Sequence, residues 1–272
     1  MTNRTESPVI IWAPTTRCGT TLLQRLITSS GDIIVFGEDL FLVRDIPHLI
    51  SKFHEQESMA NQALEKFSRG EVNFWSPNVY PDLEKYGNAM VDFFYRIIGL
   101  YRETADEKEF ENWGLKTPEF DQTSYEIFST LLPRARHLFI YRHIQDVLKS
   151  QKGRGWIEEP GDVEENAETW ADNTTQMLDD FAERDRHYCV QFRELLDNKT
   201  DYVGKIEEFL GISGIDMDVF DHKINTWQDD SDGSSNDSYT EPVELTEQEE
   251  TIMQETAWEV LERPEFEENS PE

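Results

Sequence analysis

The sequence predicts an α/β protein in which helices flank a parallel β-sheet. Short apolar runs alternate along the chain with segments of helical periodicity, as is typical of parallel strands joined by helices. Val9–Ala13 is an unbroken apolar run, as expected of a strand buried on both faces of such a sheet. The 272 residues are 12% aromatic, which supplies a core despite a high content of charged residues.

The N-terminal elements are the most clearly defined. The first apolar run ends at Pro14, and a loop of small residues follows it. The helix after this loop places four apolar residues on one face: Leu22, Leu23, Leu26 and Ile27. Ile33–Phe36 is a second short apolar strand, and it ends before Gly37.

The remaining elements continue this alternation. Helical patterns cover residues 39–70 and 88–104, and a strand-like segment at residues 113–116 leads to a helix that ends near Pro133. The later elements are a strand at 137–141, a helix at 144–151, an acidic helix at 163–183, a strand at 188–192 and a helix at 202–210.

Two parts of the chain differ in character. Residues 1–228 are expected to form the α/β domain. Residues 229–272 begin with a loop at 229–240 and continue with a helix to about residue 262, which opens with a capping box of Thr246 and Glu249. We expect this second part to pack on the same domain or to be appended to it.

The overall charge argues against several classes of protein. There are 56 acidic residues against 25 Lys and Arg, a net charge of −31, which disfavours binding to nucleic acid. No apolar run approaches the roughly 20 residues of a membrane-spanning helix. The two cysteines provide no disulfide framework. We therefore expect a cytoplasmic protein, and the excess of acid also suggests a salt-accumulating, halophilic source.

The charge is unevenly distributed. Residues 229–272 hold 16 acidic residues and one basic residue, and residues 157–187 have a net charge of −9. Residues 132–156, called here the basic segment, have a net charge of +5, with Asp146 as the one acid. An anionic ligand is the simplest reason for a local reversal of sign in so acidic a chain.

The loop after the first strand has the composition of an anion-binding site. In a strand–loop–helix unit, the first amides of the helix are unpaired and the helix dipole is positive there. In the loop sequence PTTRCGTT, Gly19 allows close approach, Thr20 and Thr21 add hydroxyl donors, and Arg17 adds a charged one. The loop is P-loop-like, but it lacks the lysine of a Walker A motif. An ordinary turn whose threonines cap the helix is the alternative.

This region resembles the sulfotransferase superfamily, and most closely its tyrosylprotein and glycan-modifying members. The shared pattern is an apolar strand, then P-T-x-R-x-G-T-T-L-L, then a strand ending in Gly-Glu. The resemblance implies that the loop holds the 5′-phosphosulfate of 3′-phosphoadenosine 5′-phosphosulfate (PAPS). The contacts implied are Arg17, Cys18, Gly19, Thr20 and Thr21. Cys18 stands where the family usually has serine.

A second motif of the same family lies in the basic segment. The stretch FIYRHIQDVLKS resembles the family's RDPRDVxxS, in which an arginine precedes a serine by eight residues. The resemblance implies that Arg142 and Ser150 contact the 3′-phosphate of PAPS, and Arg154 is a further candidate one helical turn later. His143 and Ile144 replace the usual Asp-Pro. A basic surface helix is the alternative interpretation.

Three residues are candidates for the chemistry of sulfuryl transfer. Lys116 lies in a K-T-P element resembling one whose lysine approaches the transferring sulfuryl group, and Arg17 and the loop amides would stabilise its charge. Glu38 stands at the carboxyl end of the second strand, and the resemblance implies that it is the general base. Asp39 competes for that role, and a helix-capping carboxylate is the alternative for Glu38.

The sequence thus predicts an enzyme that transfers the sulfuryl group of PAPS to a hydroxyl acceptor by in-line displacement. The acceptor is a glycan or another small metabolite, with protein tyrosine also considered. No HExxH or CxxC motif occurs, so no metal is expected. The alternatives are a divergent P-loop nucleotide kinase or NTPase and a scaffold protein that keeps only the nucleotide-binding fold.

Overall fold

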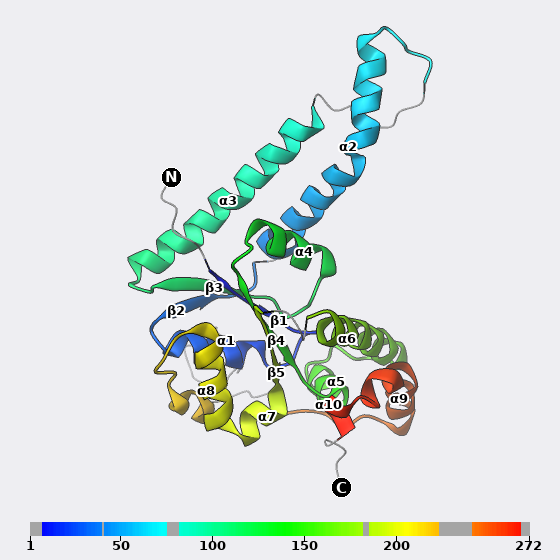
Figure 1. The fold of residues 1–272 in the computed structure, drawn as a ribbon. Helices are drawn as coiled ribbons and strands as arrows, with labels where there is room; N and C mark the ends of the chain where they lie inside the picture. The colour runs from blue at the N-terminus through cyan, green and yellow to red at the C-terminus, as the bar shows by residue number, and fades with distance from the viewer. Residues whose placement is uncertain (1–6, 40, 75–81, 182–184, 223–240, 268–272) are drawn as a thin grey trace, which may run out of the picture. The chain divides into compact units, whose positions relative to one another are not determined.

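The core of the fold is a sheet of five parallel strands in the order β2-β3-β1-β4-β5 (Figure 1). The computed structural model describes residues 7–39, 41–74, 82–181, 185–222 and 241–267. The strands are β1 (Val9–Trp12), β2 (Ile33–Phe36), β3 (Asn112–Lys116), β4 (Arg136–Tyr141) and β5 (His187–Gln191). The predicted fold class, a parallel sheet flanked by helices, is confirmed.

The position of β1 explains its composition. It pairs with β3 on one side and β4 on the other, with Ile11 in register with Lys116 of β3 and Trp12 with Phe139 of β4. All four residues of β1 are buried, and all four are apolar. A central strand of a parallel sheet needs such a run, because helices cover both of its faces.

Helix α1 (Thr20–Ser29) follows the first loop and packs through its apolar face. Leu23, Leu26 and Ile27 are buried as predicted, whereas Leu22 is only half-buried at the edge of that face. The amide of Gln24 donates a hydrogen bond of 2.8 Å to the backbone oxygen of Val35. This bond ties α1 to strand β2.

The chain divides into two compact units. The first comprises residues 1–38, 110–120 and 134–272 and contains the whole sheet. The second comprises residues 39–109 and 121–133. Besides α1, the helices of the first unit are α5 (Ile144–Gly153), α6 (Pro160–Phe181), α7 (Phe192–Asp197), α8 (Lys199–Leu210), the 3₁₀ turn η2 (Met217–Asp221), α9 (Glu247–Leu261) and α10 (Pro264–Glu267).

The second unit is helical. It contains the π-helical turn η1 (Phe41–Asp45), α2 (Ile46–Ser68), α3 (Leu83–Glu107) and α4 (Gln122–Leu131). Helix α3 begins five residues before the predicted start at 88, because Asp82 caps it by accepting a hydrogen bond from the Lys85 amide. The buried rings of Phe94 and Phe128 pack edge to face, with centroids 5.4 Å apart, and join α3 to α4.

Two predictions near the end of the chain have different outcomes. The strand expected through Phe192 ends at Gln191, because Phe192 begins helix α7. The capping box is confirmed, since Thr246 and Glu249 exchange both hydrogen bonds and α9 begins directly after them. The predicted loop at 229–240 lies outside the described residues.

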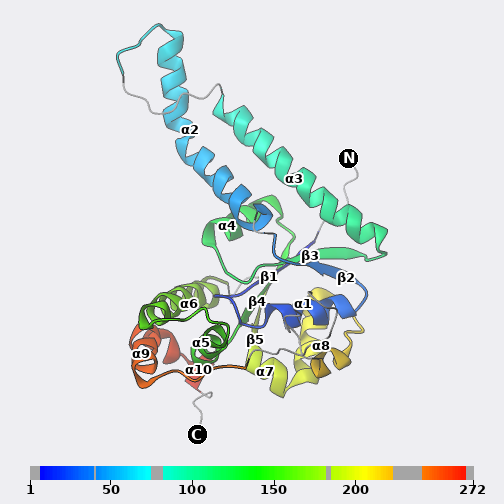
Figure 2. The same cartoon turned by 180° about the vertical axis from the view of Figure 1, so that it is seen from behind.

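Residues 241–267, called here the C-terminal segment, carry α9 and α10. Helix α9 packs along α6, and the two lie side by side in both views of the molecule (Figures 1 and 2). None of the helices that the structure describes is long and apolar enough to cross a membrane.

Candidate functional site

The predicted site residues of the first unit lie along one edge of the sheet. In a parallel sheet the carboxyl ends of the strands meet at one edge, and ligands bind where the strand order reverses. Here β1 stands between β3 and β4, so that edge carries the loop after β1, Glu38 after β2, Lys116 at the end of β3 and Arg142 after β4. These residues are far apart in the sequence, and the sheet brings their strand ends together.

The loop after β1 is shaped by Gly19. This residue is the N-cap of α1 with φ of 101°, a left-handed conformation that favours glycine. A Cβ atom at this position would lie 2.3 Å from Cδ2 of Phe192, so a side chain is excluded on steric grounds as well. Thr20 and Thr21 lie inside the first turn and do not cap the helix. The first amides of α1 therefore lack a side-chain cap, as in a helix terminus that receives an anion.

Arg17 joins the two predicted phosphate motifs. Its Nε donates a hydrogen bond of 3.0 Å to Oγ of Ser150, a buried residue of α5. Arg17 itself adopts a positive φ of 72° within the loop. Arg17, expected at the 5′-phosphosulfate, is therefore in direct contact with Ser150, expected at the 3′-phosphate.

Lys116 is the most buried cation among the predicted residues. Its Nζ lies 2.7 Å from Oε1 of Glu38 and 3.2 Å from Oγ1 of Thr21. The Lys116 side chain is only 7% exposed, whereas that of Glu38 is 43% exposed. A buried ammonium requires partners, and this one has both a carboxylate and a hydroxyl. The carboxylate also faces solvent, so a hydroxyl compound could reach it.

Asp39 is engaged elsewhere, within the second unit. Its carboxylate accepts a hydrogen bond of 3.1 Å from the Leu42 amide and another from the hydroxyl of Tyr101. Burial, together with the hydrogen bond to Asp39, raises the pKa of Tyr101 and keeps its hydroxyl protonated. Asp39 therefore performs the capping role that was the alternative for Glu38.

Arg142 lies beside an aromatic residue whose importance the sequence did not reveal. Its Nε is 3.3 Å from Oδ2 of Asp146, and its guanidinium stands 5.0 Å from the ring centre of Phe192. The same Phe192 ring closes against Gly19. Phe192 thus lies between the two predicted phosphate motifs, although the sequence predicted only that it ends a strand.

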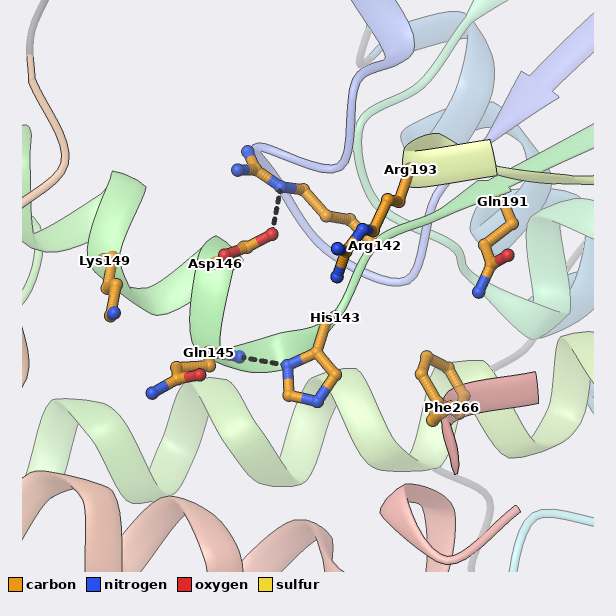
Figure 3. A pocket seen from close by; sticks show the side chains of 8 residues that line it. All are labelled: Arg142, His143, Gln145, Asp146, Lys149, Gln191, Arg193 and Phe266. Carbon is orange, nitrogen blue, oxygen red and sulfur yellow. Dashed lines mark hydrogen bonds and ion pairs between the residues drawn. The ribbon is translucent and has the colours of Figure 1, made fainter. Parts of the chain in front are cut away.

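A cavity of about 150 Å³ opens beside Arg142 (Figure 3). Three of its lining residues are cationic and one is acidic, and each cation pairs with a carboxylate: Arg142 with Asp146, Lys149 with Glu244 and Arg193 with Asp197. The lining residues are Arg142, His143, Gln145, Asp146, Lys149, Gln191, Arg193 and Phe266. Residues 191, 193 and 266 were not predicted, because they come from β5, α7 and α10.

His143 stands where the resembling motif has aspartate, and it caps helix α5. It is the N-cap of α5, and its Nδ1 accepts a hydrogen bond of 3.3 Å from the Gln145 amide, as drawn in Figure 3. Burial lowers the pKa of His143. The neutral ring can therefore accept this bond, and α5 begins at Ile144 without the usual Asp-Pro pair.

Part of the positive charge of the basic segment is paired with carboxylates of the same protein. Lys149 pairs with Glu244 at 2.6 Å and Lys152 with Glu249 at 2.5 Å, and both glutamates belong to the C-terminal segment. Arg154, the predicted third phosphate contact, is half-buried at the end of α5, one turn after Ser150. Part of the positive charge of this segment therefore serves to hold the fold together.

Cys18 presents no side chain at the surface of the loop. Its side chain is fully buried, and burial raises the pKa of its thiol to about 12. The thiol is therefore protonated at neutral pH. Among the residues that the structure describes, no group of three or more His, Cys, Asp or Glu is arranged to hold a metal ion.

Comparisons with known proteins point to one family. The model of the sulfotransferase family matches residues 8–216. No curated protein sequence matches the chain. The sulfotransferase domain of the Synechococcus PCC 7002 olefin synthase has a similar fold, with 15% identity and a TM-score of 0.50 over 94% of this chain and 97% of that one.

Two further solved structures are less similar. The sulfotransferase domain from the curacin biosynthetic pathway is 14% identical, with a TM-score of 0.45 over 96% of this chain and 93% of that one. A sulfotransferase from Mycobacterium avium is 11% identical, with a TM-score of 0.42 over 80% of this chain and 66% of that one. At these identities, structural likeness speaks to the fold alone.

Proposed function

Because the chain belongs to the sulfotransferase family, we propose that it transfers the sulfuryl group of PAPS to a hydroxyl acceptor. The observation that carries the proposal is the buried Lys116 ammonium, which lies between the Thr21 hydroxyl and the Glu38 carboxylate at the carboxyl edge of the sheet. A cation and a base are thus side by side next to a helix N-terminus suited to an anion.

The residues around the loop after β1 fit a polyanionic donor. The first-turn amides of α1, the hydroxyls of Thr20 and Thr21, and the Arg17 guanidinium would hold the phosphosulfate end. Gly19 gives the loop its left-handed turn before α1, and the Phe192 ring occupies the place where its side chain would stand. The fit rests on these donors and on the positive end of the helix dipole.

The other end of the donor would be bound from α5. Arg142 and Ser150 are the proposed contacts to the 3′-phosphate, with Arg154 as a third. The hydrogen bond between Arg17 and Ser150 supports this proposal, because it puts the two phosphate motifs within reach of one small molecule. The cavity beside Arg142 adds room on the same side of the strand ends.

The proposed reaction is an in-line displacement at sulfur. The acceptor oxygen forms a bond to sulfur as the bond from sulfur to the bridging oxygen of the 5′-phosphate breaks. Glu38 takes the proton of the acceptor hydroxyl. Lys116 and Arg17 stabilise the negative charge that develops on the sulfonate and on the departing oxygen. The products are a sulfate ester and adenosine 3′,5′-bisphosphate.

A transfer assay tests this function. The enzyme is incubated with PAPS and with one acceptor at a time, a glycan, a small alcohol or a tyrosine peptide, and the release of adenosine 3′,5′-bisphosphate is measured. We expect release to depend on one acceptor class and to disappear in Glu38→Gln. Turnover of ATP with magnesium in place of PAPS would support a nucleotide kinase or NTPase instead. Binding without any turnover would support a scaffold.

A further inference from the structure

Helix α5 is held from two sides. On one side it contacts the loop after β1. Ser150 accepts the hydrogen bond from Arg17, and the side-chain amide of Gln151 donates a hydrogen bond of 3.1 Å to Oγ1 of Thr16. These two contacts set the distance between the two proposed phosphate-binding motifs. Any shift of α5 would therefore change the spacing of Arg17 and Ser150.

The C-terminal segment holds the other side of α5. The Val243 amide donates a hydrogen bond of 3.0 Å to the backbone oxygen of Lys149. At Gly153 a Cβ atom would lie 2.2 Å from the backbone oxygen of Glu241, so the two backbones are in direct contact. The 2.6 Å ion pair of Lys149 and Glu244 adds to this contact, although the Glu244 side chain is 78% exposed.

The ion pair of Lys152 and Glu249 is the less exposed of the two that link these elements. Its side chains are 18% and 8% exposed. Glu249 also accepts a hydrogen bond of 2.6 Å from the Thr246 amide and so completes the capping box of α9. Removing one charge of so enclosed a pair leaves the other charge poorly solvated, which disturbs its surroundings.

We infer that Lys152 and Glu249 form a positioning pair for the donor site. The pair fixes α5 against the C-terminal segment and thereby keeps Ser150 within hydrogen-bonding distance of Arg17. This inference rests on the proposed function, because it concerns the binding of the 3′-phosphate. Glu249 lies beyond residue 216, where the match to the family model ends, whereas Lys152 lies within the matched residues.

Glu249→Gln separates the role of Glu249 in the capping box of α9 from its role in the ion pair with Lys152. Glutamine at this position still completes a capping box, so α9 keeps its start, while the charge opposite Lys152 is lost. Binding of adenosine 3′,5′-bisphosphate and of adenosine 5′-monophosphate is measured by calorimetry. We expect affinity for the bisphosphate to fall about tenfold, the equivalent of one charge-assisted hydrogen bond, and affinity for the monophosphate to stay unchanged.

Matched variants control for net charge and for stability. Glu247→Gln makes the same change of charge in the same helical turn at an exposed residue and should leave both affinities unchanged. Lys152→Gln should lower the ratio of the two affinities as Glu249→Gln does, and the double variant should lower it no further. Lys152→Arg keeps the charge and should keep the ratio.

The ratio of the affinity for the bisphosphate to the affinity for the monophosphate tests the inference. If Glu249→Gln and Lys152→Gln lower the melting temperature but leave the ratio as in the wild type, the pair is only structural and the inference is wrong. If the wild-type enzyme itself shows no preference for the bisphosphate, the proposed donor site is wrong, and the positioning pair fails with it. These two failures are distinguished by the wild-type measurement alone.

Discussion

The ammonium of Lys116 and the carboxylate of Glu38 form an ion pair of 2.7 Å, although 78 residues separate them in the chain. Lys116 ends β3 and Glu38 follows β2, and these two strands are neighbours in the sheet. The pairing of parallel strands therefore brings the cation and the proposed base together. Within this pair each charge neutralises the other.

Glu38→Gln should abolish transfer while leaving nucleotide binding intact. The amide cannot take the proton of the acceptor, and loss of a general base costs about 10²–10⁴-fold in rate. The rate is measured with PAPS and the best acceptor, and calorimetry gives the dissociation constant for the bisphosphate. Asp39→Asn is the control: it should lower stability through the Leu42 cap yet keep the rate. An active Glu38→Gln enzyme would assign the base to another residue.

Lys116→Met should lower kcat by about 10²–10³-fold, the usual cost of losing one group that stabilises developing charge. Methionine fills the buried space next to Thr21 without a charge, so the sheet should remain folded. Stopped assays give the rate, and circular dichroism checks the fold. An unchanged kcat with a raised KM would mean that Lys116 contributes to binding alone.

Gly19→Ala should destabilise the protein and weaken nucleotide binding. A left-handed conformation costs a residue with a side chain about 1–2 kcal/mol, and the added Cβ would also collide with Phe192. Gly31→Ala is a matched control, because Gly31 has φ of 80° and a Cβ atom added there would meet nothing within 4 Å. Urea unfolding should show a clearly smaller loss for Gly31→Ala. Equal losses would contradict the role of the Phe192 contact.

The features that could be predicted from the sequence are those formed by residues close together in the chain. The apolar runs and the capping box depend on neighbouring residues, and their positions agree with the structure within a few residues. The place of Phe192 between Gly19 and Arg142 could not be predicted, since it depends on how β5 and α7 meet the loop. The partners of Lys149 and Lys152 likewise lie about a hundred residues later, and a count of charge cannot show which cations are already paired.

Acid should destabilise the fold through His137. This buried ring accepts a hydrogen bond of 3.0 Å from Trp12 Nε1 and stacks on His187 with centroids 4.9 Å apart. Burial, and then the neighbouring His187, lowers the pKa of His137 from 6.5 to about 3. The unfolded chain therefore binds the proton more readily, and stability falls as pH drops from 6.5 toward 3.

The size of this effect is about 1.4 kcal/mol for each pH unit within that window. Urea unfolding of the wild type and of His137→Gln is compared at about pH 7 and about pH 5, above most of the carboxyl titration. The loss on acidification should be smaller in the variant, which carries no group to protonate at this position. Equal losses in both proteins would place the acid sensitivity elsewhere.

The most direct test of the donor site is a calorimetric titration with adenosine 3′,5′-bisphosphate and with ATP and magnesium, at low and at molar salt. We expect the wild type to bind the bisphosphate selectively, and Arg142→Ala, which removes the cation after β4, to abolish this binding. Preference of the wild type for ATP with magnesium, or an Arg142→Ala variant that binds the bisphosphate as tightly as the wild type, would contradict the proposed donor site.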